Sequence, residues 1–349
     1  MFGKFSEFCS CRICFLLREN FQSHVQKMWK KVLERVRKLA RQPRHDRDGM
    51  DTYRAALLLK CHEWHVHPDR IGTTVQPKKE DVEKFYADVN SLETEYLKEY
   101  ATTRLNEQVL NMFTHIRDSG VVSTNNNKNG SNLSKIRASP AINNSRHSLM
   151  KSIGFELDCR ASKCSSDAGN GVFIRMHQDG IIAPGTVLAF FPGLVHLPEY
   201  TTKKGYVTEK LLPDPHLMLM CRLDNTIIDG RTADKCPRNP YALAHLVNHV
   251  PKGSMPNVQQ YPYDFPGDPL GKEEFPRELQ YLIPNEYSAK PTLLGTIDRS
   301  AMMRGAVLLA ARPLKHGDEL YMDYRLNPMG GALPSWYTAY NPEGETTSN

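Results

Sequence analysis

The residue types best suited to chemistry gather near the C-terminal end, in the segment from Gly317 to Tyr324. A Gly-Asp turn leads into a run where apolar residues alternate with Tyr321 and Asp323, and this period of two predicts a short strand. Aspartate is depleted in strands, so Asp323 calls for a partner, an exposed edge or a functional site. An ordinary hairpin strand also satisfies the pattern, and the rest of the chain has to decide between these interpretations.

Two further groups of residues have the chemistry of metal ligands. The run His62 to His67 carries histidines three and five residues after His62, whereas a helical zinc pair needs a spacing of four. The cluster Cys9-x-Cys11-x-x-Cys14 could bind zinc with His24 as a fourth ligand, but structural zinc sites normally show two paired spacings. Acylated cysteines and a mobile tail are the alternatives there. We therefore expect no metal site.

Length and charge bound the class of protein. The 349 residues suffice for one large and one smaller domain. No apolar run approaches the roughly 18 residues of a membrane helix, and residues 13–17 are shorter than a signal-peptide core. We expect an intracellular protein with reduced thiols. The net charge of +6 is concentrated in residues 27–47, which hold nine basic residues. Direct nucleic-acid binding is therefore not predicted elsewhere.

The N-terminal third is predicted to be helical over residues 25–120, after a tail of residues 1–24. Residues 25–47 have the pattern of a basic amphipathic helix. Such a helix could lie on a membrane surface, act as a nuclear or mitochondrial targeting signal, or pack on the hydrophobic core with its basic face in solvent. A nuclear or cytoplasmic location is the default, with a mitochondrial one as the alternative. Further helices are predicted over Thr52 to Trp64 and, without interruption, Glu80 to Arg117.

Residues 121–147 are rich in Asn, Ser and Lys and predict a flexible linker. Residues 148–326 instead contain short β-type runs that are separated by Gly and Pro. A tail follows at residues 327–349. The runs are Gly171 to Arg175, Val187 to Phe191, Leu217 to Cys221, Thr226 to Asp229 and Ala306 to Ala311. Helices followed by many short strands predict an α+β fold.

Five pieces of this β-rich part occur in a fixed order. They are Gly169-Asn170-Gly171, Pro184-Gly185 with Phe191-Pro192-Gly193, Ile228-Asp229-Gly230, Asn248-His249 with Pro256-Asn257, and Gly317 to Tyr324. Each piece is weak alone, but chance matches rarely fall in order. Together they resemble the SET-domain methyltransferases, which transfer a methyl group from S-adenosylmethionine, usually to a protein lysine.

The resemblance implies a β-rich SET fold of several small sheets with a knot-like C-terminal crossing. It implies that Gly169, Asn170, Gly171, Asn248, His249 and Tyr324 bind S-adenosylmethionine. Tyr324 is implied as the catalytic tyrosine that orients a lysine of a protein substrate, histone or non-histone. The alternative is a purely structural role, in which Asn248 and His249 form hydrogen bonds with buried backbone groups and Tyr324 is a hydrogen-bonded core residue.

The chain also departs from the family pattern. Phe191 and Met322 stand where many members carry tyrosine, and residues 250–255 replace the usual Ser-Cys after Asn-His with a longer loop. We expect residues 259–304 to be an insertion or a surface element, and Trp336 and Tyr337 to pack on a neighbouring surface or cover the lysine channel. The competing hypothesis is therefore a SET-fold interaction protein that is weakly active or inactive.

Overall fold

The computed structural model describes residues 44–67, 69, 77–120, 149–164, 169–177, 180–211, 218–235, 238–267, 275–289, 301–326 and 337–338. The predicted tail 1–24, the cysteine cluster within it, the linker 121–147 and most of the basic helix 25–47 lie outside these residues. Asp51–Tyr340 form one compact unit, and Met1–Met50 with Asn341–Asn349 are assigned to a second. The description below concerns the first unit.

Three helices precede the β-rich part: α2 (Arg44–Val66), α3 (Lys79–Asn90) and α4 (Thr94–Asp118). The helix predicted over Thr52 to Trp64 is confirmed as part of α2. The single helix predicted from Glu80 to Arg117 is wrong, because the chain breaks between α3 and α4. Ser91 ends α3, with its hydroxyl donating to the Asp88 carbonyl at 2.7 Å. Asn and Ser favour helix ends, but the apolar periodicity continues across the break and concealed it.

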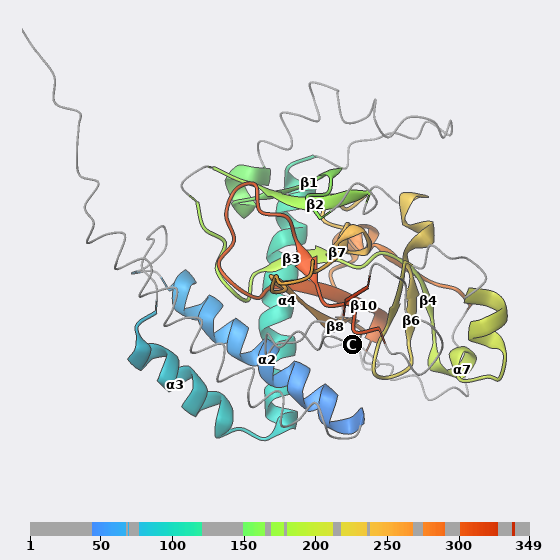
Figure 1. Cartoon of the computed structure of the whole chain (residues 1–349), viewed down its shortest axis with the longest axis horizontal. Coiled ribbons are helices and arrows are strands. Elements are labelled where there is room, and N and C mark those ends of the chain that lie inside the picture. Colours follow the sequence, from blue (N-terminus) through green and yellow to red (C-terminus); the bar gives the residue numbers. More distant parts are fainter. Residues whose placement is uncertain are drawn as a thin grey trace, which may run out of the picture. The chain divides into compact units, whose positions relative to one another are not determined.

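The central sheet has three antiparallel strands in the order β3 (Val187–Phe190), β10 (Ala301–Ala310) and β8 (Val258–Pro266). Helix α4 lies beside this sheet (Figure 1), and its Phe113 side chain packs against the strands. The Phe113 ring lies 5.1 Å from that of Phe190, 6.0 Å from Phe265 and 5.6 Å from Phe275, measured between centroids. All four rings are buried. We call these four phenylalanines the aromatic seam.

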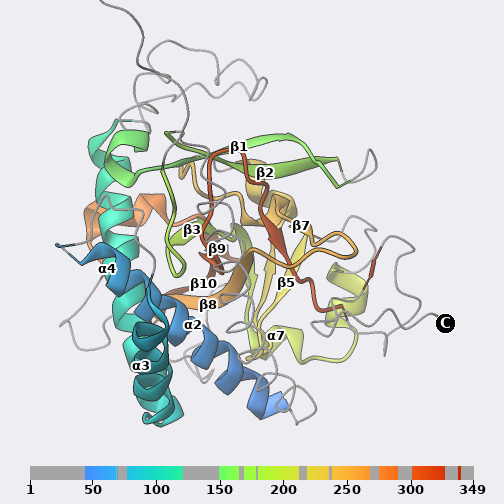
Figure 2. The same cartoon turned by 60° about the vertical axis from the view of Figure 1, so that its left-hand side comes forward.

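Polar contacts also bind the helices to the sheet. The Gln108 side chain of α4 donates to the Gly185 carbonyl at 3.0 Å and accepts from the Val187 amide at 2.9 Å. Gly185 has φ +83°, and a Cβ there would lie 2.1 Å from the Leu58 carbonyl oxygen of α2. Only glycine allows so close an approach. Figure 2 shows α2, α3 and α4 along one flank of the strands, so helices and strands share one core.

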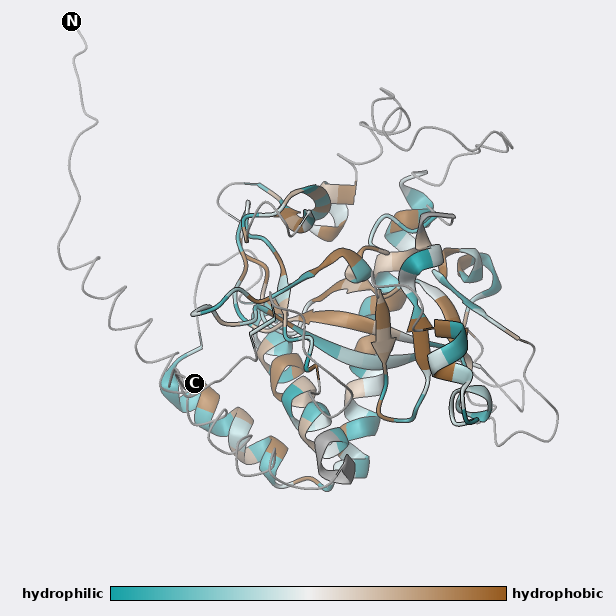
Figure 3. Ribbon diagram, turned by 45° about the vertical axis from the view of Figure 1, so that its right-hand side comes forward, coloured by the Kyte–Doolittle hydropathy of each residue, from teal (hydrophilic) through white to brown (hydrophobic). Residues whose placement is uncertain are grey.

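The remaining strands form three smaller sheets. Their members are β1 (Glu156–Ala161) with β2 (Asn170–Arg175); β5 (Leu219–Cys221), β6 (Ile227–Asp229), β4 (Gly193–His196) and β9 (Asn285–Tyr287); and β7 (Asn248–His249) with β11 (Tyr321–Met322). Short helical turns connect them: α7 (Pro198–Thr201), Val207–Leu211, Gly230–Lys235, Ala244–Leu246 and Arg277–Leu282. Helices with several small, mostly antiparallel sheets confirm the α+β class. In Figure 3 several of the strands are strongly hydrophobic, while the helices carry both kinds of residue.

The expectation that residues 259–304 form an insertion is wrong for their beginning and end. Residues up to Pro266 belong to β8, and β10 begins at Ala301. The prolines concealed the strand, yet β8 lies at the sheet edge, where proline is tolerated because no neighbour needs its missing N–H. Tyr261, Tyr263 and Phe265 are buried on alternate positions.

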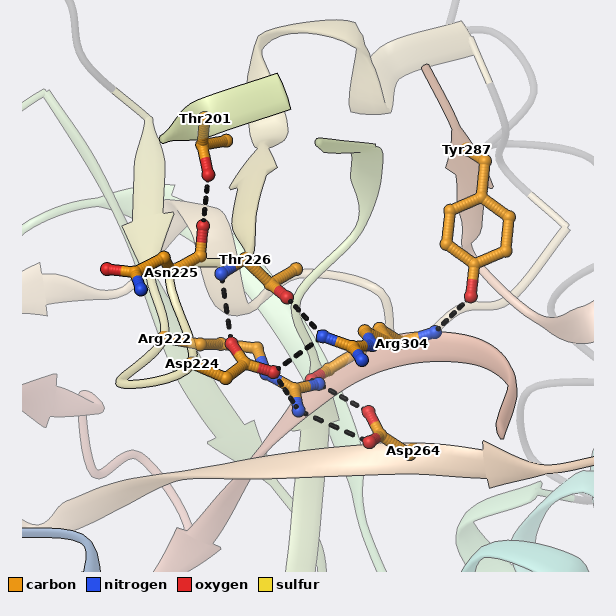
Figure 4. A network of polar contacts seen from close by, with 9 residues as sticks. Thr201, Arg222, Asp224, Asn225, Thr226, Asp264, Tyr287 and Arg304 are labelled. Carbon is orange, nitrogen blue, oxygen red and sulfur yellow. Dashed lines mark hydrogen bonds and ion pairs between the residues drawn. The ribbon is translucent and has the colours of Figure 1, made fainter. Parts of the chain in front are cut away.

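A polar network fastens the β5–β6 turn to the central sheet (Figure 4). The buried Arg222 guanidinium pairs with Asp264 of β8 and donates to the Gly305 carbonyl of β10 at 2.9 Å. Asp224 accepts from Arg222 at 3.0 Å and from Arg304 of β10 at 2.9 Å. The network therefore holds the four-stranded sheet to β8 and β10 through charge-assisted hydrogen bonds.

Candidate functional site

Two segments far apart in the sequence meet at β7 and β11. The strands are parallel, with Tyr321 opposite Asn248 and Met322 opposite His249. The pairing continues through the Val250 amide, which donates to the Met322 carbonyl at 3.0 Å. The structure thus brings together the Asn-His segment and the C-terminal strand, which the family resemblance had linked. Met322 is buried here.

Glu319 lies at the centre of this meeting point and is only 3% exposed. Its carboxylate accepts hydrogen bonds from the Ser162 hydroxyl (2.6 Å), the Lys163 amide (2.7 Å), the Tyr321 hydroxyl (2.7 Å) and the Asn248 side chain (3.3 Å). Burying a carboxylate costs free energy unless donors replace the lost water. Four donors do so here, and they come from three separate segments of the chain.

Asn257 fixes the same strand from the other side. It is 1% exposed, its side-chain amide donates to the Glu319 carbonyl at 2.7 Å, and its side-chain oxygen accepts from the Tyr321 amide at 2.7 Å. The sequence assigned Asn257 to a motif but gave it no role. We call Glu319 with Ser162, Lys163, Asn248, Asn257 and Tyr321 the polar crossing.

The two predicted cofactor glycines have different surroundings. A Cβ on Gly171 would lie 2.1 Å from Glu319 Oε1, so the absence of a side chain there makes room for the carboxylate itself. Gly169 has φ +66° and open space where a Cβ would stand. Gly169 and Asn170 are both exposed, and the Asn170 carbonyl accepts from the Asn248 side chain at 3.2 Å. They form an open rim beside Asn248.

Asn248 is half-buried, and its side-chain nitrogen is shared between Asn170 and Glu319. These bonds orient the amide group. Among the residues that the structure describes, none donates to the Asn248 Oδ1 atom. The site therefore offers a fixed hydrogen-bond acceptor next to an open glycine rim, which suits a ligand with an ammonium or amide donor.

Tyr324 follows β11 and is held at three points. Its hydroxyl donates to the Val247 carbonyl at 3.0 Å, its amide donates to His249 Nδ1 at 3.2 Å, and its ring centroid lies 5.3 Å from that of His249. Burial raises the pKa of the Tyr324 hydroxyl to about 12. At neutral pH the group is therefore a protonated hydroxyl with a fixed orientation.

Both ring nitrogens of His249 are engaged within the protein. Because Nδ1 accepts from the Tyr324 amide, the proton is assigned to Nε2, which donates to the Thr338 carbonyl at 2.7 Å. The Tyr337 ring stacks on His249 with centroids 4.6 Å apart, and Tyr337 is buried. A cofactor would therefore have to reach His249 through its backbone. Tyr337 therefore packs on the predicted site itself, and both of its expected placements stay predictions, while Trp336 lies outside the described residues.

A cysteine from another segment of the chain, Cys164, lies next to the Asn-His segment. The loop after His249 lacks the usual Ser-Cys, but the Cys164 thiol lies 3.9 Å from the His249 carbonyl oxygen. Burial raises the pKa of the neighbouring Tyr321 hydroxyl, and hydrogen bonds to Glu319 and to Cys164 raise it further. Sequence spacing could not reveal this contact because Cys164 belongs to the segment after β1.

Phe191, like Met322, is an apolar residue at a position where many members of the family carry tyrosine. Phe191 is 3% exposed and meets His245 at 6.4 Å in an edge-on arrangement. A Cβ added to Gly230 would lie 3.3 Å from the Phe191 ring. The Phe191 ring is therefore closely packed, and no hydroxyl is supplied at this position.

The described part of the chain contains no group of three or more His, Cys, Asp or Glu residues arranged to hold a metal ion. No helix among those residues combines the length and the apolar character needed to cross a membrane.

Comparison with known proteins supports a distant relationship to the SET-domain proteins. SET domain-containing protein 9 from Homo sapiens is 25% identical over 203 residues, which cover 50% of this chain and 60% of that protein. SET domain-containing protein 9 from Pongo abelii is also 25% identical over 203 residues, covering 50% of this chain and 66% of the relative. The match thus spans less than two thirds of each relative. No family model matches the chain.

Proposed function

We propose that this chain is a SET-type methyltransferase that uses S-adenosylmethionine and methylates a lysine of a protein substrate, histone or non-histone. One observation carries the proposal: the parallel pairing of β7 with β11 sets Asn248, whose Oδ1 accepts from no described residue, beside the strand that leads to the oriented Tyr324 hydroxyl. Both residues come from motifs that resemble this family, and the distant relatives bear its name.

The residues around the polar crossing suit the cofactor. Gly169 and Asn170 leave an exposed rim for close approach, and Asn248 Oδ1 can accept from the cofactor ammonium group. His249 takes part by holding the backbone in place. When bound, S-adenosylmethionine supplies a methyl group activated by its sulfonium. The protein's task is then to align a neutral amine with that group.

Tyr324 orients the amine and does not deprotonate it. With a pKa raised to about 12, its hydroxyl keeps its proton at neutral pH. That proton is donated to the Val247 carbonyl, which fixes the direction of the hydroxyl group that orients the lysine amine. Lysine is charged near its ordinary pKa and has to lose a proton before it can attack. We propose that solvent on the substrate side accepts this lysine proton.

The competing proposal is an interaction protein that retains the scaffold and has little or no activity. It is favoured by the buried Phe191 and Met322, which supply no hydroxyl, and by the engagement of both His249 ring nitrogens. These features lower the number of polar groups available to an amine without altering the polar crossing. The two proposals differ in turnover and not in fold.

For the whole chain we propose a SET domain over residues 148–326, preceded by a helical region at 25–120 and a linker at 121–147. A nuclear or cytoplasmic location is proposed, with a mitochondrial one if the basic pattern at 25–47 acts as an address. The protein substrate is proposed from the family resemblance alone.

The proposal is tested by incubating the protein with methyl-labelled S-adenosylmethionine and a cell extract. We expect label on protein, and a loss of about a hundredfold or more with Tyr324→Phe. Tyr281→Phe is the matched control, because Tyr281 is 37% exposed and belongs to the turn at Arg277–Leu282. Unchanged transfer by Tyr324→Phe would remove this residue from the mechanism, and no transfer by the parent protein would favour the interaction protein.

A further inference from the structure

Arg325, the residue after Tyr324, has an unusual backbone. Its φ is +51°, in the left-handed region that residues with a Cβ rarely adopt. Part of the compensation is local, since the Arg325 amide donates to Asp323 Oδ1 at 3.0 Å. A conformation that is unfavourable in isolation has to be held by its surroundings.

The surroundings are supplied by helix α2. The Arg325 guanidinium donates two hydrogen bonds to the Asp51 carboxylate, Nη1 to Oδ2 at 2.7 Å and Nη2 to Oδ1 at 2.9 Å. This two-point geometry fixes direction as well as distance. Asp51 is 8% exposed, whereas the Arg325 side chain is 45% exposed, so solvent screens the pair in part and its main contribution is the two-point geometry. The contact joins residues 274 positions apart.

Asp51 is itself anchored. Its backbone carbonyl accepts from the Gln259 side chain of β8 at 3.1 Å. The next residue, Thr52, is 1% exposed and its hydroxyl lies 3.5 Å from the Tyr261 hydroxyl, also on β8. The carboxylate is therefore presented from a helix that is fixed to the central sheet, and not from a mobile side chain on the surface.

We propose that Asp51 is a positioning residue for Tyr324. By holding Arg325 in its left-handed conformation, the carboxylate fixes the chain directly after Tyr324. The amide bond to His249 and the hydroxyl bond to Val247 then keep their geometry. This inference rests on the proposed function in one respect only: Tyr324 is the residue whose position matters for methyl transfer. Helix α2 thereby becomes part of the candidate active site.

The inference is tested on the full chain with Asp51→Asn, which keeps the shape of the side chain but replaces one acceptor by an amide. Glu63→Gln is the matched control. Glu63 also belongs to α2 and pairs with Arg104 at 2.6 Å and Lys60 at 3.3 Å, but not with the β11 segment. Hydrogen exchange of single amides by NMR is the readout, because it measures local opening without requiring turnover.

We expect the Tyr324 amide to exchange about tenfold faster in Asp51→Asn and unchanged in Glu63→Gln. The amide of Leu308, in the central strand β10, reports opening of the core and should not change. Equal acceleration at Tyr324 and Leu308 would overturn the inference, because Asp51 would then support only the fold. An unchanged Tyr324 amide in Asp51→Asn would overturn it as well.

Turnover gives the functional arm. Asp51→Asn should lower kcat about tenfold and leave KM for S-adenosylmethionine unchanged, because Asn248 and the glycine rim are not touched. A rise in KM with kcat intact would contradict the positioning role. If the parent protein shows no turnover while the Tyr324 amide responds as expected, the proposed function fails and the structural role of Asp51 stands.

Discussion

The aromatic seam and the polar crossing join segments far apart in the sequence, but they do so by different physics. At the seam, Phe113 of α4 meets three phenylalanines from β3, β8 and the segment before the turn at Arg277–Leu282, and all are buried. At the crossing, a single buried carboxylate gathers donors from separate segments. Burial of apolar area is not directional, whereas hydrogen bonds are. The first therefore secures stability, and the second secures the geometry that a site needs.

The largest effect on stability is expected at the seam. Phe113→Ala should lower the free energy of unfolding by about 4 kcal/mol, because it removes a fully buried ring and leaves a cavity. Urea unfolding measures the change. Phe113→Leu, which keeps most of the volume, should cost less than about 2 kcal/mol. Equal losses for the two variants would contradict a packing role.

The junction between α2 and the strands predicts a pH dependence. Burial lowers the pKa of His62 to about 4 from an ordinary value of 6.5. The neutral form is favoured in the folded state, so the unfolded chain binds more protons between these values. Stability is therefore present above pH 6.5 and is lost as the pH falls towards 4, by about 3 kcal/mol. Unfolding from pH 7 to 4.5 should show this loss, and His62→Asn should have a flatter profile over that window. The same pH profile for the parent protein and His62→Asn would show that His62 does not cause the pH dependence.

The polar crossing should respond differently. Glu319→Gln replaces one acceptor by a donor that faces other donors, at a cost of about 2 kcal/mol. It also weakens one of the two hydrogen bonds that orient the Asn248 side chain, so S-adenosylmethionine should bind at least about tenfold more weakly. Asp318→Asn is a neighbouring control, because Asp318 accepts from the Lys315 amide in an exposed turn. Scanning calorimetry measures the stability of Glu319→Gln, and titration calorimetry measures its affinity for S-adenosylmethionine. A loss of stability without a loss of affinity would show that the polar crossing does not support cofactor binding.

The smallest effect is expected in the network of Figure 4. The Asp224 side chain is 37% exposed, so Asp224→Asn should cost about 1 kcal/mol although it touches two arginines. Combining it with Arg304→Gln should cost less than the sum of the single changes, because both remove the same contact. Additive losses measured by thermal unfolding would show that the two residues act independently.

The sequence predicted those parts of the fold that depend on local pattern. The strand around Gly171 to Arg175, the helix at Thr52 to Trp64 and the α+β class follow from periodicity and turn residues. The break at Ser91 and the edge strand at β8 were missed. In the first case apolar periodicity continued through a helix end, and in the second prolines lay in a strand with one free side.

The candidate site was predictable only where a resemblance linked its segments. Asn248 and Tyr324 were singled out together by motif, and the structure brings their strands into register. The contacts of Glu319, Asn257 and Asp51 depend on side chains meeting across long separations, which no local spacing encodes. The Arg325 backbone gave no signal either, since arginine does not favour φ above zero.

Calorimetric titration of the intact chain with S-adenosylmethionine tests the central claim most directly, namely that the β7–β11 crossing forms a cofactor site. The account predicts one-site binding to the parent protein, and binding at least about tenfold weaker to Asn248→Ala, which removes the Oδ1 acceptor that no described residue occupies. Asn106→Ala, on helix α4, should bind as the parent does, because the Asn106 side chain accepts from the Tyr263 hydroxyl and is not part of the polar crossing. Absence of binding to a folded parent protein, or equal binding by Asn248→Ala, would contradict the claim.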